Sequence, residues 1–132
     1  MSAQAKRLAL LGFFREALAR LQDALSQPKT EFLRDASIQR FELAFEMFWK
    51  TLKAVAEESG LQPVAPRDSL RAGFSLGVLD EDAAFFRMIE DRNLTSHAYR
   101  LEMAERIYSR LPQYAALMAD CLGRIEARLR EG

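Results

Sequence analysis

The residues best suited to chemistry lie in one short stretch, 91–100, which reads DRNLTSHAYR. It contains the only histidine of the chain, His97, five residues after Arg92 and two residues before Tyr99. An arginine offers planar, permanently charged donors for a phosphate, and a histidine can exchange a proton near neutral pH. With RNA, such a pair could deprotonate the 2′-hydroxyl and stabilise the charge that develops on phosphorus, without a metal.

Neighbouring polar side chains extend this candidate site. Asn93 could orient a substrate or the histidine, and Tyr99 adds a stacking surface and a hydroxyl. Arg92, Ser96 and Tyr99 also continue a helical face whose preceding residues are apolar. Polar residues on such a face form either a buried network or a binding site. The structural alternative is that the arginine and the histidine only satisfy the last carbonyls of a helix and its dipole.

The spacing of Arg92 and His97 restricts how they could act together. On a straight helix, side chains five positions apart point about 140° away from each other. One phosphate could therefore contact both only if the helix loosens near Thr95 and Ser96, or if a second copy of the chain contributes. This geometry, and an excess of aromatic residues further upstream, predict a two-fold dimer with the two motifs beside a shared cleft.

Amphipathic helices are predicted to position these residues, because apolar residues recur at intervals of three and four along most of the chain. One helix ends before the segment 26–29, whose proline forbids continuation. The next, near 31–59, starts with Thr30 as its N-cap and ends at Gly60. A short helix follows, with Asp68 as its expected cap and Gly77 as its end.

Two further helices complete the prediction. The acidic residues 80–82 mark the start of a helix whose face runs from Phe85 to Tyr99. The last helix covers 103–129, and Pro112 should kink it or split it. No segment alternates with the period of a strand. The predicted fold is all-α, an antiparallel bundle of four long helices and one short one, in a single domain 1–132.

Composition narrows the class of protein. The 132 residues include 19 basic and 19 acidic side chains, so a nucleic acid could bind only at a local site. One cysteine, Cys121, excludes an intrachain disulfide and a thiolate zinc cluster. No apolar run is long enough to span a bilayer, and the N-terminus lacks the shape of a signal peptide. We therefore expect a cytoplasmic protein with no membrane contact.

Three blocks of the sequence resemble one family. The stretch DRNLTSHAY resembles the Arg-x4-His-x-Tyr signature of HEPN domains, small helical bundles encoded beside minimal nucleotidyltransferases. Residues 40–53 (RFELAFEMFWKTLK), 66–81 (PRDSLRAGFSLGVLDE) and 88–108 (MIEDRNLTSHAYRLEMAERIY) are similar to blocks of the nucleotidyltransferase substrate-binding branch. With their connections they span about 30–118, most of the chain. One departure is Arg100, where that branch commonly has an acidic residue.

The resemblance implies a homodimer that associates with a separate minimal nucleotidyltransferase chain and supplies a nucleotide or substrate cleft. In related toxins, the residues matching Arg92 and His97 cleave RNA without metal, and the tyrosine matching Tyr99 accepts an adenylyl group from the partner. Three hypotheses follow: an accessory substrate-binding subunit with a nucleotide ligand, a ribonuclease toxin, and a non-catalytic dimeric scaffold. We take the first as the main one, with Arg92, Asn93, Ser96, His97 and Tyr99 as site residues.

Other candidates lie on the helix near 31–59. Glu42 and Glu46 share a face, and Glu46 is in position to pair with Lys50. Glu42 is the candidate for the cleft wall opposite Arg92. A carboxylate metal site is disfavoured, because the chain has one histidine and no second ligand motif. Trp49 is expected either in the core or in a subunit contact. No zinc pattern or phosphate-binding glycine loop is present, so we expect neither a metal nor a cofactor.

Overall fold

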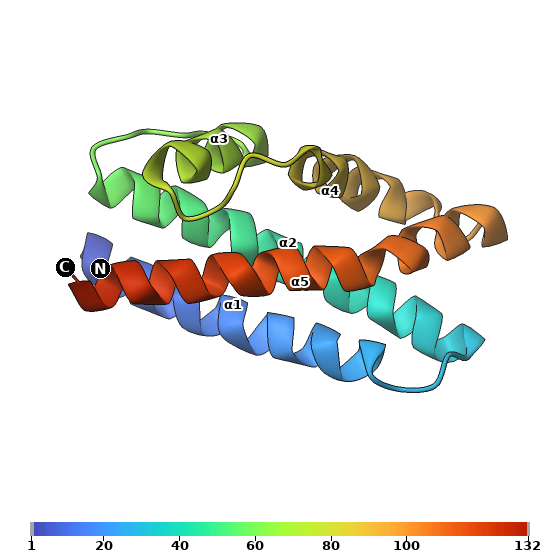
Figure 1. Cartoon of the computed structure of the whole chain (residues 1–132). Coiled ribbons are helices and arrows are strands. Elements are labelled where there is room, and N and C mark those ends of the chain that lie inside the picture. The colour runs from blue at the N-terminus through green and yellow to red at the C-terminus, as the bar shows by residue number, and fades with distance from the viewer. Residues whose placement is uncertain (1, 132) are drawn as a thin grey trace.

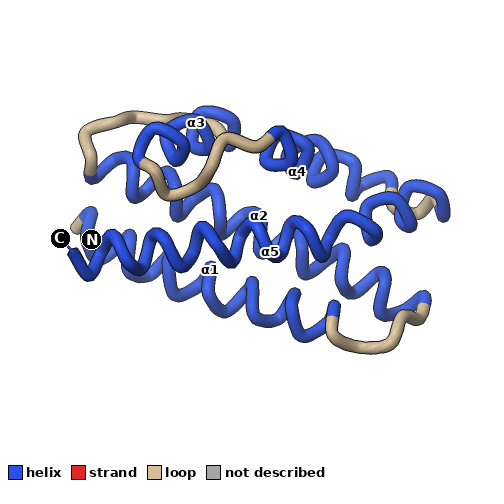
Figure 2. Tube along the Cα trace, viewed as in Figure 1, coloured by secondary structure: helices blue, strands red, loops and turns tan. Residues whose placement is uncertain are grey.

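The computed structural model describes residues 2–131, which form helices joined by short connections (Figures 1 and 2). The elements are, in chain order, α1 (Ala3–Leu25), α2 (Glu31–Glu58), α3 (Pro66–Leu76), α4 (Ala83–Leu94), a 3₁₀ turn (Thr95–His97) and α5 (Leu101–Glu131). No strand occurs within residues 2–131, which confirms the all-α prediction. Three helices are long and two are short, whereas four long helices and one short one were predicted.

Helix α2 is the centre of the bundle, since it packs against each of the four other helices. Figure 1 shows α1 antiparallel to both α2 and α5, which run in the same direction. The segment from Gly60 to Leu94 makes this possible by carrying the chain back along the bundle. Helices α3 and α4 thereby cover α2 on the side away from α1 (Figures 1 and 2).

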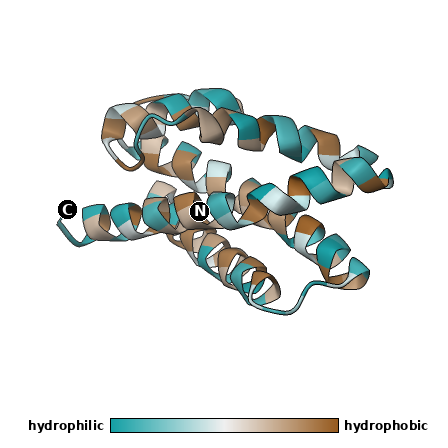
Figure 3. Cartoon of the chain, turned by 45° about the vertical axis from the view of Figure 1, so that its right-hand side comes forward, coloured by the Kyte–Doolittle hydropathy of each residue, from teal (hydrophilic) through white to brown (hydrophobic). Residues whose placement is uncertain are grey.

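Aromatic pairs fix the helices against one another. Phe14 of α1 lies 5.5 Å from Phe48 of α2, measured between ring centroids, and Phe48 stacks on Phe85 of α4 at 6.0 Å. Phe41 of α2 stacks on Tyr114 of α5 at 5.6 Å. All five rings are buried, as the spacing of apolar residues predicts. Figure 3 shows apolar and polar residues alternating along the helices, as expected when each helix buries one face.

Local sequence signals set most helix ends. The Thr30 side chain accepts a hydrogen bond of 3.0 Å from the third residue of α2, which confirms its predicted cap. The Asp82 carboxylate accepts one of 2.9 Å from the second residue of α4. Gly60 and Gly77 follow α2 and α3 with φ of 89° and 76°, a conformation that favours glycine.

The start of α3 differs from the prediction. Asp68 does not cap the helix, which begins two residues earlier at Pro66. The proline occupies the first helical position, where its missing N–H costs no hydrogen bond and its fixed φ suits a helix. Asp68 lies instead in the first turn, where its charge is favourable near the positive end of the helix dipole.

Helix α5 is continuous through Pro112, so the predicted split does not occur. Pro112 is exposed, and the helix bends in its N-terminal part, drawn in orange in Figure 1. A proline inside a helix removes one backbone hydrogen bond and pushes against the preceding turn. The bend is consistent with the predicted kink.

The start of α1 and the end of α5 lie together at one end of the bundle, and the corner between α4 and α5 lies at the other (Figure 1). Near the first end, Arg7 of α1 pairs with Glu58 at the end of α2. Across residues 2–131, no helix is both long enough and apolar enough to cross a membrane.

Candidate functional site

The motif spans the corner between α4 and α5. Helix α4 ends at Leu94, and the next three residues form the 3₁₀ turn. The Thr95 hydroxyl donates a hydrogen bond of 2.7 Å to the Arg92 carbonyl, and two backbone bonds of 3.1 Å, from Ala98 to Thr95 and from Arg100 to His97, close the turn. The helix therefore loosens near Thr95, as simultaneous use of Arg92 and His97 would require.

The face of α4 that enters the core differs from the predicted one. Asp91 and Thr95 are the buried polar residues, with 1% and 8% of their surface exposed. Arg92 is half-buried, Ser96 is exposed, and Tyr99 is 77% exposed. The predicted continuation of the stripe to Tyr99 is wrong, because the regular helix ends five residues before it and the 3₁₀ turn changes the angle between successive side chains.

Arg92 has an unused hydrogen-bond donor. Its Nε is buried and has no hydrogen-bond partner among residues 2–131. Its guanidinium also takes part in none of the ion pairs formed within the described chain. A half-buried guanidinium without a carboxylate partner keeps its charge available for a ligand.

Glu46 of α2 is a half-buried acid whose pKa responds to the charge of Arg92, although the two side chains form no ion pair. Its carboxylate accepts hydrogen bonds from Lys50 at 3.0 Å and from the Trp49 indole at 3.1 Å. Burial opposes its ionisation, but these hydrogen bonds and the charges of Lys50 and Arg92 hold the pKa of Glu46 below its ordinary value. The predicted Glu46–Lys50 pair is confirmed, and half-buried Trp49 packs against the core.

Glu42 lies half-buried on α2, one turn before Glu46. It forms no side-chain hydrogen bond or ion pair with another described residue, so its place opposite Arg92 stays a prediction. No group of three or more His, Cys, Asp or Glu side chains in the described chain could hold a metal ion.

The remaining motif residues face solvent. Asn93, Ser96 and His97 are exposed, and the His97 and Tyr99 rings lie 6.3 Å apart with an angle of 60° between their planes. The Ser96 hydroxyl makes one long contact, 3.4 Å, with the Asn93 carbonyl. The structure thus brings the imidazole and the phenol side by side at the corner and leaves both free to contact a ligand.

A buried polar network next to Arg92 was missed from the sequence. The Asp91 carboxylate accepts a hydrogen bond of 2.5 Å from the Tyr114 hydroxyl and bonds of 2.9 and 3.1 Å from Arg110. The same hydroxyl accepts a bond of 3.0 Å from Arg87, which also donates to Gln113 at 2.6 Å. The sequence did contain one signal of this network: Asp91 lies three residues after Met88, so an acid falls on the apolar face of the helix.

The electrostatics of this network follow from its burial. Burial disfavours the phenolate and the nearby Asp91 disfavours it further, which together raise the pKa of Tyr114 to about 12. The carboxylate in turn raises the pKa of Arg110, chiefly through their hydrogen bond. Asp91 is therefore a buried carboxylate that, among residues 2–131, accepts side-chain hydrogen bonds only from α5.

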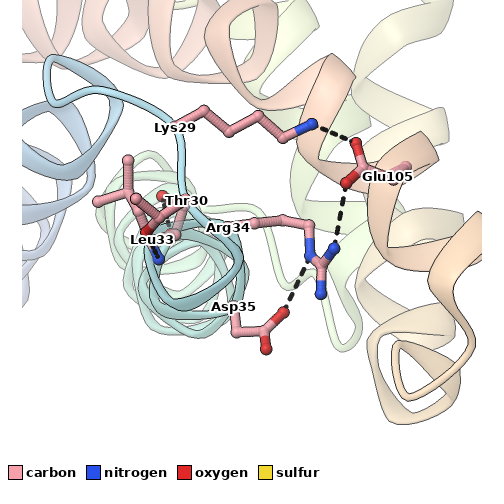
Figure 4. Close-up of polar contacts among 7 residues, drawn as sticks. Lys29, Thr30, Leu33, Arg34, Asp35 and Glu105 are labelled. Carbon is pink, nitrogen blue, oxygen red and sulfur yellow. Dashed lines mark hydrogen bonds and ion pairs between the residues drawn. The ribbon is translucent and has the colours of Figure 1, made fainter.

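A second polar cluster holds the neighbouring end of α2 to α5 (Figure 4). Glu105 of α5 accepts hydrogen bonds from Lys29, at 2.5 Å, and from the buried Arg34, at 3.1 Å. Arg34 also contacts Asp35 at 3.1 Å. The hydrogen bonds from Lys29 and Arg34 lower the pKa of Glu105. This cluster fixes the first part of α5, which leads directly from the motif.

Comparison with known proteins places these features in a family. Residues 10–127 match the family model described as nucleotidyltransferase substrate binding protein like. A crystal structure of a Thermus thermophilus protein shares 41% sequence identity, covers 84% of this chain and 97% of its own, and superposes with a TM-score of 0.78. No curated protein matches the chain.

A more distant structure supports the fold. The Haemophilus influenzae protein HI0074, described as revealing the fold of a substrate binding domain of a nucleotidyltransferase, is 20% identical. The match covers 88% of this chain and 98% of that one, with a TM-score of 0.79. At this identity the likeness shows a shared helical fold.

Proposed function

Because the chain belongs to the nucleotidyltransferase substrate binding protein-like family, we propose that it is the substrate-binding subunit of a two-component nucleotidyltransferase. The description of HI0074 as a substrate binding domain of a nucleotidyltransferase supports this role. In this proposal the catalytic carboxylates belong to a separate nucleotidyltransferase chain, and this chain, one domain over 1–132, offers a nucleotide to it. The described residues contain no acidic cluster able to hold the metal such catalysis uses.

The observation that carries the proposal is the unpaired guanidinium of Arg92. Arg92 would bind a phosphate of the nucleotide by charge-assisted hydrogen bonds. Asn93 and Ser96, exposed in the same motif, would add neutral hydrogen bonds. His97 and Tyr99, whose rings lie side by side, would contact the phosphate and the base, and Tyr99 is the candidate for adenylylation.

A homodimer is part of the proposal. Tyr99 is 77% exposed and Leu101 is 63% exposed, so two large apolar side chains stand at the corner that carries the motif. Large exposed apolar groups beside a polar site are typical of an interface. A two-fold contact here would place two copies of Arg92 and His97 around one cleft.

Isothermal titration of the full-length protein, alone and in complex with its co-expressed nucleotidyltransferase, tests the binding site. The ligands are AMP, ATP and a short RNA, and the variants are Arg92→Gln and His97→Ala. Loss of a charge-assisted contact should weaken nucleotide binding by roughly ten- to a hundredfold. Arg71→Gln, which removes an exposed arginine of α3, is the matched control and should bind as the wild type does.

The outcomes separate the hypotheses. Unchanged affinity in both motif variants would contradict the proposed site. The ribonuclease alternative would be favoured if the protein cleaves the RNA without a metal, if His97→Ala abolishes this cleavage, and if Tyr99→Phe preserves it. Melting temperatures lowered by several degrees with no change in affinity would identify the motif as a scaffold.

A further inference from the structure

The last turn of α4 is tied to α5 through one buried carboxylate. Asp91 is 1% exposed and accepts hydrogen bonds from Arg110 and from the fully buried Tyr114. The two other side-chain bonds that join α4 to α5 within the described chain come from Arg87, and one of them ends on the same Tyr114 hydroxyl. Every side-chain hydrogen bond between the two helices in residues 2–131 therefore involves Asp91 or Arg87, which share the Tyr114 hydroxyl.

Helix α4 needs such a tie. It has only 12 residues, a length at which an isolated helix is marginal in water. Near its start, Phe85 stacks on Phe48 of α2. After Met88, the buried side chains are Asp91 and Thr95, both polar, while Ile89 and Leu94 pack only partly buried against the core. The orientation of the last turn thus depends on hydrogen bonds as well as on apolar packing.

This orientation decides where Arg92 points. Successive side chains on a helix lie about 100° apart, so the contacts that hold Asp91 against α5 also fix the direction of Arg92, whose Nε is buried without a partner among the described residues. A rotation of the last turn would therefore redirect Arg92.

We infer that Asp91 is a positioning residue of the nucleotide site: its hydrogen bonds to Arg110 and Tyr114 hold Arg92 in the direction that binds phosphate. This inference rests on the proposed function, since it needs Arg92 to contact the ligand. Asp91 itself is enclosed and contacts no ligand. Its effect on binding must pass through Arg92, which distinguishes it from a residue that only stabilises the fold.

A double-mutant cycle measures this dependence. AMP and ATP are titrated calorimetrically into the full-length wild type, Asp91→Asn, Arg92→Gln and the double variant. Asp91→Asn should weaken binding by about three- to tenfold when Arg92 is present, which is within the range of couplings between neighbouring residues. In the Arg92→Gln background, the same change should have no further effect on affinity.

Asp80→Asn is the matched control. Asp80 also pairs with an arginine, Arg124, at 2.8 and 2.9 Å, but it is exposed and lies at the other end of α4. This variant should leave nucleotide affinity unchanged in both backgrounds. If Asp91→Asn does not fold, as judged by circular dichroism, Tyr114→Phe replaces it in the cycle, because it removes one hydrogen bond of Asp91 and keeps the ring.

The two proposals fail in different ways. If Arg92→Gln leaves affinity unchanged, the proposed site is wrong and the role of Asp91 falls with it. If Arg92→Gln weakens binding but Asp91→Asn weakens it by the same factor in both backgrounds, only the positioning role is wrong. A lower melting temperature for Asp91→Asn without any loss of affinity would likewise reduce Asp91 to a structural residue.

Discussion

Removal of the Tyr114 hydroxyl should destabilise the protein more than its small volume indicates. The hydroxyl donates a hydrogen bond of 2.5 Å to the Asp91 carboxylate and accepts one of 3.0 Å from Arg87. In Tyr114→Phe, a buried charge loses one donor, and no water can replace it because Asp91 is only 1% exposed. A hydrogen bond to a charged group contributes about 1.5–3 kcal/mol. The ring itself keeps its stacking on Phe41 at 5.6 Å.

The free energy of unfolding, measured by urea denaturation at pH 7, should therefore fall by about 1.5–3 kcal/mol, and the melting temperature by roughly 5–12 °C. Tyr108→Phe is the control. Tyr108 is half-buried, and its hydroxyl has no hydrogen-bond partner among residues 2–131. Its loss should change stability by less than about 0.5 kcal/mol. Equal stability of the two variants would refute the reasoning that the Asp91 hydrogen bonds stabilise the contact between α4 and α5.

Three other expectations concern pH, glycines and the thiol. An unfolded tyrosine ionises near pH 10, whereas the pKa of Tyr114 in the folded protein is about 12. Because the folded state keeps this proton to a higher pH, the free energy of unfolding should fall between these two pH values. Urea titrations should show the stability difference between wild type and Tyr114→Phe becoming smaller over this range. Gly12→Ala, inside α1 with no atom near the added methyl, should raise stability by about 0.5–1 kcal/mol in the same titrations, and Gly77→Ala, at φ 76°, should lower it by about 1 kcal/mol. Burial raises the pKa of the Cys121 thiol, so Ellman's reagent should react with it only after denaturation.

Helix existence could be predicted from the sequence because its signals are local. The apolar spacing around Phe41 and Tyr114 identified faces that the structure buries. Thr30, Gly60 and Gly77 mark helix ends through contacts with residues a few positions away, so their roles could be read directly. The family resemblance, which spans about 30–118 of the sequence, is confirmed by the family match over 10–127.

The site was less predictable because its geometry depends on distant residues. Asp91 is satisfied by groups 19 and 23 positions further along the chain, and no local pattern reveals such partners. The end of α4 at Leu94 was also not predicted, because a continuous helical period runs through the sequence to Tyr99. Which acid of α2 lies near Arg92 depends on how α4 packs across α2, and Glu42 forms no side-chain hydrogen bond or ion pair with another described residue.

The start of α1 and the end of α5 are placed favourably for experiments on this protein. Both lie at the end of the bundle opposite the motif corner, and α5, with 31 residues, spans the distance from that end to the corner. At 1.5 Å per residue, that distance is about 45 Å. A fluorophore, a purification tag or a surface anchor attached at Ser2 or Glu131 would therefore stand clear of the corner. A protein immobilised in this way would present its motif to solution, where the docking of a second protein could be measured without interference from the attachment.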